Sequence, residues 1–215
     1  MNLMFTSDKI SFILAFSFVS CLLITDSFAQ ARGRPLVPTT RQAAPSREKV
    51  TIRRISGIGA SGRAYTPEYN TDAKEHNTVR RTWARISVEY TTKADWINEL
   101  EFRYYTLVQH PQTKNFYFFP GTVTYIDIAK GEHASTIFLS PSALKRYGAI
   151  KRIAVEIYSR GQLVAVESNP KDKQAWWRMV TALPNVKTKE GMLLNRAQTP
   201  FAFVAFNNYE MIKHK

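Results

Sequence analysis

The chain has 215 residues, a length that suits one domain of ordinary size preceded by a short leader. Lys and Arg number 30 against 17 Asp and Glu, which gives a formal net charge of +13. This charge favours anionic partners such as lipid headgroups, acidic polysaccharide or an acidic protein face, although it also serves simple solubility. The charges are spread along the chain and no motif of an RNA-binding domain is present, so we do not expect nucleic acid as a partner.

Residues 1–29 have the organisation of a secretory signal peptide. Lys9 precedes an apolar run over residues 10–24, and the small side chains of Ser27 and Ala29 suit cleavage after position 29. A second cleavage site lies two residues further on. The apolar run is shorter than the ~20 residues of a membrane span. We therefore expect export, cleavage and no stable membrane span after processing.

The single cysteine, Cys21, lies inside that apolar run. A lipoprotein signal would end at its cysteine, whereas residues 22–24 continue the run, so we do not expect lipidation. The processed chain would then contain no disulfide and would depend on its core for stability. Export without disulfides suits the periplasm or the cell surface of a bacterium better than eukaryotic secretion.

Residues 30–49 have the composition of an extended basic linker. They contain three prolines, several small polar residues and five basic residues against one Glu. Loss of residues 1–29, which hold one Lys and two Asp, would raise the formal charge from +13 to +14.

From residue 50 onward, apolar and polar residues alternate, and turn residues separate the alternating segments. Ile86, Val88 and Tyr90 form the apolar face of one segment, as in one layer of an antiparallel sandwich. The expected strands cover residues 50–55, 83–91, 98–108, 116–119, 123–128, 134–139, 153–157, 163–166 and 201–206. Residues 130–132 are expected to turn the chain, and residues 176–183 fit either a strand or a helix.

One short helix is expected among these strands. Ser140 can cap it, Pro141 fits its first position and Gly148 can close its C-terminus. Strand spacing and turn density favour an all-β, two-layer antiparallel sandwich over a closed barrel. The expected core includes Ile86, Val88, Leu100, Phe102, Tyr104, Ile153, Val155 and Ile157.

The spacings that carry metal and catalytic chemistry are missing from the sequence. The four histidines have no His, Cys or carboxylate partner at helical spacing, and the acidic residues form no calcium loop. The Gly-rich segment 57–62 lacks the Lys-Ser/Thr ending of a phosphate loop. We expect no enzyme, no metal and no cofactor, and we expect His110 and His133, beside turns, to be solvated.

Trp176, Trp177 and Arg178 are the candidate partner-binding residues. On a strand, adjacent side chains point to opposite faces, so one tryptophan would be buried and the other exposed. An exposed Trp beside an Arg could stack on a sugar ring or contact a partner protein. The alternative is that both tryptophans cover the core at the edge of a sheet.

Three stretches of the chain carry a resemblance to a known class of domain. They are WARISVEY at 83–90, WINELEFRYY at 96–105 and the hairpin at 153–166. In strand pattern they resemble a secreted immunoglobulin-like sandwich of the kind encoded beside type IV pilus genes in the Verrucomicrobia and Planctomycetes group. The resemblance implies an immunoglobulin-like β-sandwich domain over residues 50–210 and an accessory or structural role at a pilus or secretion apparatus. It transfers no catalytic residues, and the paired cysteines of antibody domains are absent.

Two binding functions and one catalytic function follow as hypotheses. The first is a non-catalytic assembly or interaction protein of the cell envelope, which contacts an envelope protein through sheet edges and loops. The second is a module that binds carbohydrate or another anionic polymer, such as an anionic glycan, through Trp176 or Trp177 and the basic surface. An enzyme is the third, and its mark would be a deep pocket with His110 or His133 beside a carboxylate.

Overall fold

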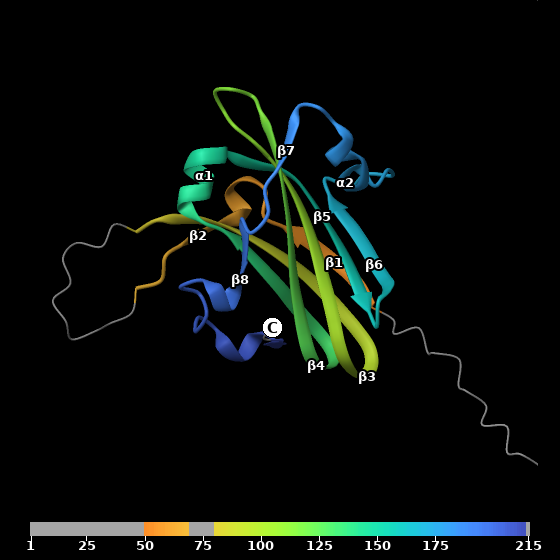
Figure 1. The fold of residues 1–215 in the computed structure, drawn as a ribbon. Coiled ribbons are helices and arrows are strands. Elements are labelled where there is room, and N and C mark those ends of the chain that lie inside the picture. The colour runs from red at the N-terminus through yellow and green to blue at the C-terminus, as the bar shows by residue number, and fades with distance from the viewer. Residues whose placement is uncertain (1–49, 69–79, 214–215) are drawn as a thin grey trace, which may run out of the picture. The chain divides into compact units, whose positions relative to one another are not determined.

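The computed structural model describes residues 50–68 and 80–213, and the expected signal peptide and linker lie outside this part of the chain. The described chain is all-β, with nine strands in one hydrogen-bonded sheet (Figure 1). The strands are β1 (Val50–Ser56), β2 (Arg63–Tyr65), β3 (Thr82–Gln109), β4 (Phe116–Leu139), β5 (Ala149–Ser159), β6 (Gln162–Asn169), β7 (Val186–Thr188), β8 (Leu193–Asn195) and β9 (Met211–Ile212). The helical segments are α1 (Pro141–Tyr147), the single turn α2 (Trp176–Met179) and the 3-10 turns η1 (Gly59–Gly62), η2 (Val180–Ala182), η3 (Arg196–Gln198) and η4 (Phe206–Asn208).

The two longest strands, β3 and β4, form one hairpin around which the sheet is built. They pair from the turn at residues 110–115 to the pair Ala84 and Leu139 at the far end. The register shifts after Thr92, and its partner Gly131 has a φ of 148°. A bulge and a glycine at facing positions bend a strand pair, so the hairpin folds back over itself.

This bend corrects the strand boundaries that the sequence predicted. Residues 83–91 and 98–108 lie in a single strand, and so do residues 123–128 and 134–139. The predicted turn at residues 130–132 is therefore wrong. Gly131 is the residue that suggested a turn, but at its positive φ the chain bends and stays paired with β3.

The bent hairpin produces two layers. β4 takes one edge of β3 along its whole length, while β1 pairs with the first half of the other edge and β5 with the second half. The halves face each other: the rings of Tyr90 and Phe102 lie 5.0 Å apart, and the Tyr104 hydroxyl is 2.5 Å from Ser135 Oγ. Among the described strands, β1 and β6 do not pair, so the arrangement is the predicted sandwich rather than a closed barrel.

Two local predictions are confirmed in detail. In α1, Ser140 Oγ accepts a hydrogen bond from the Ala143 amide, Pro141 occupies the first turn and Gly148 ends the helix at a φ of 100°. A Cβ at position 148 would lie 2.2 Å from a backbone oxygen, so glycine is required there. The hairpin of β5 and β6 turns through two residues with positive φ, which matches the twist of the flanking strands.

The expected core is also confirmed. All eight side chains predicted for it are fully buried between the two layers, with 0% relative exposure. They come from β3 and β5, and the inner face of β4 packs against them. The predicted last strand is wrong, because residues 201–206 form successive turns that end in η4.

We predict that Phe102→Asp unfolds the protein. Large-to-small changes of a buried Phe cost ~3–5 kcal/mol, and an unpaired carboxylate in the core adds a desolvation cost. The sum approaches the ~5–15 kcal/mol that stabilise a typical domain. The control is Phe203→Asp, because the ring of Phe203 is 77% exposed. Thermal melting by circular dichroism checks both variants, and an unchanged melting temperature for Phe102→Asp would contradict the core assignment.

Candidate interaction surface

The second layer is formed by β5 with the second half of β3 and the first half of β4. Its outer face carries a small apolar cluster of its own. The side chains of Phe118 and Ala154 lie on this face, and Trp176, Trp177 and Val180 pack over them. The segment formed by α2 and η2 therefore covers the outer face of the sheet at this position. The predicted partner-binding residues, Trp176, Trp177 and Arg178, all lie in this covering segment.

Both tryptophans are buried, at 7% relative exposure each, so the expected exposed Trp platform is wrong. The physical reason is that Trp176 and Trp177 lie in a helical turn, and both indoles contact the sheet beneath it. The Trp177 ring is stacked 6.3 Å from the Tyr105 ring. Arg178 alone keeps an exposed side chain, at 57%. Contact between Arg178 and a partner stays a prediction.

The sequence did not identify the residue that organises this cluster, which is Glu156 on β5. It is 2% exposed. Its Oε1 accepts hydrogen bonds from Trp177 Nε1 at 3.0 Å and from Arg178 Nη2 at 2.6 Å. Its Oε2 accepts from the hydroxyls of Tyr158 at 2.8 Å and Tyr105 at 3.2 Å. The signal in the sequence was Ala154, a small apolar residue that alternates with the core residues of the same strand and leaves room for a covering segment.

The electrostatics of this cluster keep the carboxylate charged. Burial by itself raises the pKa of Glu156, but the hydrogen bonds from Trp177, Arg178 and Tyr158 outweigh it and hold the pKa below its usual value. Burial and the neighbouring Glu156 charge raise the pKa of Tyr105 to about 12, so its phenol stays a neutral donor. The arrangement anchors α2 to the sheet, because each carboxylate oxygen already accepts at least two hydrogen bonds.

His133 is a second correction. Its side chain is 8% exposed rather than solvated, because residues 130–132 form a bend and not a surface turn. Nδ1 lies 2.7 Å from Glu210 Oε1, and Nε2 lies 2.9 Å from the Ala129 carbonyl oxygen. The histidine therefore does lie beside a carboxylate, but both ring nitrogens are engaged in joining the bend to the C-terminal segment.

The described ranges contain neither a metal-binding cluster nor a membrane-spanning helix. No group of three or more His, Cys, Asp or Glu side chains there could hold a metal ion. No helix in the same ranges has the length and apolar character needed to cross a bilayer.

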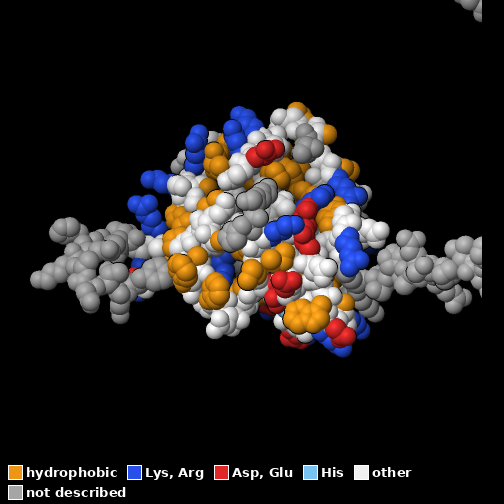
Figure 2. Space-filling view, turned by 60° about the horizontal axis from the view of Figure 1, so that its bottom comes forward, with side chains coloured by type: hydrophobic (Ala, Val, Ile, Leu, Met, Phe, Trp, Pro, Cys, Tyr) orange, Lys and Arg blue, Asp and Glu red, His pale blue; other side chains and the backbone are white. Residues whose placement is uncertain are grey.

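The C-terminal segment presents the most exposed aromatic side chain in the described chain. Phe203 is 77% exposed, Phe206 63% and Met211 65%, and Val204 is also exposed. We call these four residues the C-terminal apolar surface. Figure 2, which brings this end of the molecule forward, shows several exposed hydrophobic side chains on this face, interspersed with polar and charged ones. Exposed apolar side chains that lie together on a surface are candidates for a contact site.

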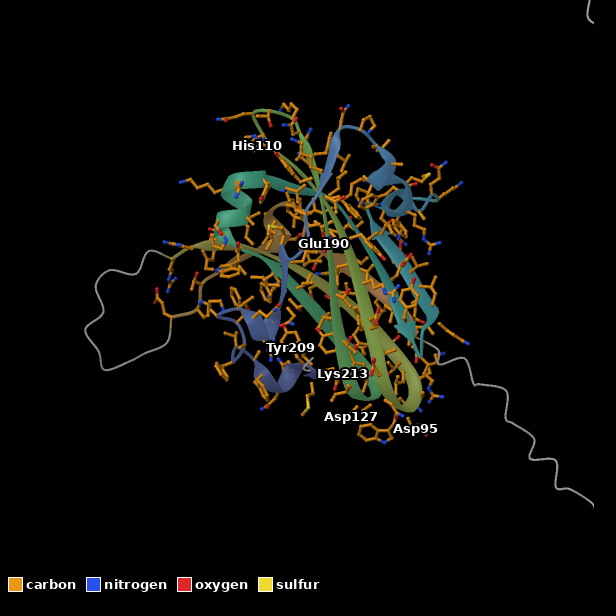
Figure 3. All side chains as sticks on the ribbon, in the orientation of Figure 1. Asp95, His110, Asp127, Glu190, Tyr209 and Lys213 are labelled. Atoms are coloured by element: carbon orange, nitrogen blue, oxygen red, sulfur yellow. The ribbon has the colours of Figure 1, made fainter. Side chains whose placement is uncertain are left out.

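Polar contacts and a short strand pairing hold this irregular segment in place. The Arg196 guanidinium donates a hydrogen bond to the Val204 carbonyl oxygen at 2.8 Å and lies 4.2 Å from the Tyr209 ring centre. β9 pairs with β4, and Lys213 Nζ is 2.5 Å from Glu99 Oε2. Figure 3 places Tyr209 and Lys213 in this segment. The surface is therefore preorganised, with its backbone tied down and its apolar side chains directed outward.

We predict that acid weakens the anchoring of α2 through Glu156. Because the pKa of Glu156 is lowered in the folded state, its stabilising effect is complete above its ordinary unfolded pKa of about 4.3 and is lost as pH falls through the folded pKa. Glu156→Gln should cost about 3 kcal/mol at pH 7, and the difference from wild type should shrink below about pH 4. Urea unfolding between pH 3 and pH 7 measures this difference.

Glu89→Gln is the matched control for that experiment, because Glu89 is half-exposed and its ion pair with Arg54 is long, at 3.6 Å. Its cost should stay below about 1 kcal/mol. A pH-independent cost for Glu156→Gln would show that shape, and not the carboxylate charge, matters at this position.

The chain is similar to known proteins in its fold and in its match to a family model. A search of curated proteins finds no match. A crystal structure of a protein from Akkermansia muciniphila, a member of the Verrucomicrobia, is similar in fold, with a TM-score of 0.67 and 22% sequence identity. The match covers 78% of this chain and 94% of the other. A family model matches residues 42–215, which include every described strand. The chain therefore belongs to the family that this model describes.

Proposed function

We propose that the protein is a non-catalytic assembly or interaction protein of the cell envelope. Its partner is a second envelope protein, and its contact site is the C-terminal apolar surface. The observation that carries the proposal is the outward exposure of Phe203, Phe206 and Met211 on a segment that polar contacts and a strand pairing hold in place. Aromatic residues and Met are enriched at protein interfaces, and a fixed backbone lowers the entropic cost of binding.

The cellular setting of the proposal rests on the sequence. The N-terminal 29 residues have the pattern of a signal peptide, and the expected processed chain has no cysteine. The strand pattern resembles immunoglobulin-like domains encoded beside pilus genes, and the similar fold from a verrucomicrobial protein is consistent with that group. We therefore favour an accessory role at a pilus or secretion apparatus, on an immunoglobulin-like sandwich, in the periplasm or at the cell surface.

The proposal is tested by identifying the proteins that the exported protein contacts in the cell envelope. Crosslinking in the native host, followed by mass spectrometry, should recover a pilus or secretion component. Phe203→Ser should weaken this capture by about 30-fold, the effect of an interface residue worth 2 kcal/mol. This ring is the most exposed of the four side chains, so the variant should keep the wild-type melting temperature.

Leu163→Ser on β6 is the control, because Leu163 is also an exposed large apolar residue but belongs to a different element. It should leave capture unchanged. Equal loss in both variants would argue against a specific C-terminal contact. Recovery of nothing above a charge-matched control protein would overturn the proposed function itself.

A further inference from the structure

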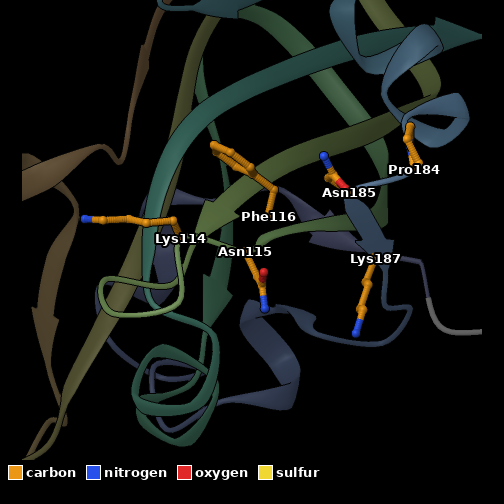
Figure 4. Close-up of a pocket in the computed structure, with 6 residues that line it drawn as sticks. All are labelled: Lys114, Asn115, Phe116, Pro184, Asn185 and Lys187. Carbon is orange, nitrogen blue, oxygen red and sulfur yellow. The ribbon is translucent and has the colours of Figure 1, made fainter.

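A hollow of about 310 Å³ lies between the β3–β4 turn and the segment that leads into β7. Its lining consists of Lys114, Asn115, Phe116, Pro184, Asn185 and Lys187 (Figure 4). The parallel pairing of β7 with β4 sets Val186 beside Phe116 and so brings together two segments that are distant in sequence. The volume is at the lower end of the range for small-molecule sites, about 300–1,000 Å³, and suits one sugar ring.

The polar side chains of this pocket have no partner within the described chain. The ammonium groups of Lys114 and Lys187 and the amides of Asn115 and Asn185 make no hydrogen bond or ion pair with another described residue. Some other cations of the domain are instead engaged by a carboxylate, such as Arg178 by Glu156 and Lys213 by Glu99. The four groups are therefore available to a ligand.

The charge and shape of the lining select the kind of ligand. No Asp or Glu lines the pocket, so the two lysines make it attractive to an anion. In Figure 4 the side chains of Asn115 and Lys187 extend in the same direction, whereas Lys114 extends away from the others. We therefore expect Lys187 to form the ion pair with the ligand and Lys114 to lie at the rim of the pocket.

The remaining lining residues match a sugar better than a bare anion. An amide both donates and accepts hydrogen bonds, as a sugar hydroxyl does, and the pocket has two amides. Phe116 and Pro184 add apolar surface against which the C–H groups of a ring can pack. We propose that the pocket binds one acidic sugar unit, a pyranose that bears a carboxylate or phosphate group, with Lys187 pairing the acid.

This site is separate from the C-terminal apolar surface. The pocket residues lie at the β3–β4 turn and before or within β7, whereas Phe203, Phe206 and Met211 follow β8. A variant that loses sugar binding should keep the protein contact, and a variant that loses the protein contact should keep sugar binding. The two proposals therefore fail independently.

Calorimetric titration of the purified protein tests the pocket with four probes. They are oligogalacturonate, glucose 6-phosphate, neutral maltohexaose and inorganic phosphate. We expect one of the two acidic sugars to bind with one unit per pocket, and neither maltohexaose nor inorganic phosphate to bind at the same concentration. Preference for oligogalacturonate would assign a carboxylate ligand, and preference for glucose 6-phosphate a phosphorylated one.

Lys187→Gln should weaken binding of the acidic sugar at least about tenfold, the usual effect of losing a charged hydrogen bond. The control is Lys173→Gln, which removes the same charge from an exposed lysine outside the pocket lining. It should change affinity by less than about twofold, because a distant surface charge is screened by salt. Both lysines are exposed, so melting temperatures should match wild type.

Three results would overturn the proposal. Equal weakening by Lys187→Gln and Lys173→Gln would mean that net charge alone attracts the ligand. Inorganic phosphate binding as tightly as the sugars would mean that the pocket recognises an anion without a ring. Failure of both acidic sugars to bind the wild-type protein would remove the site altogether.

Discussion

Pairing of β3 with β4 along most of their length, on both sides of the bend, supports both layers of the described domain. Because both strands pass through the bend at Thr92 and Gly131, the apolar side chains of their two halves face each other. The same bend lets β1 and β5 share one edge of β3 while lying in different layers. A straight hairpin would separate Tyr90 from Phe102 and expose the surface whose burial drives folding.

The outer face of the second layer shows how a buried charge can organise packing. Glu156 would destabilise a dry face if it were alone, but Trp177 and Arg178 bring donors to it from α2. The apolar parts of the tryptophans then cover the sheet. Residues that suggested a binding platform thus serve the protein's own fold, and the surface left for contacts lies elsewhere.

The contact surfaces that we propose are irregular segments held by the sheet. The C-terminal apolar surface is fixed by Arg196 and by the pairing of β9 with β4, and the pocket is fixed by the pairing of β7 with β4. In both cases β4 supplies the edge to which a short strand adds. Loops placed by a rigid sheet are where binding residues commonly occur, since they can vary without disturbing the core.

The sequence by itself determined the features that depend on residues close together in the chain. These are the all-β class, the cap at Ser140, the β5–β6 hairpin and the buried faces of β3 and β5, because alternation and turn chemistry are local. Only the tertiary structure decided which bends are turns, which faces stay wet and which segments share a pocket. Gly131, Glu156 and Lys187 have roles set by partners far away in sequence, and no local pattern specifies a distant partner.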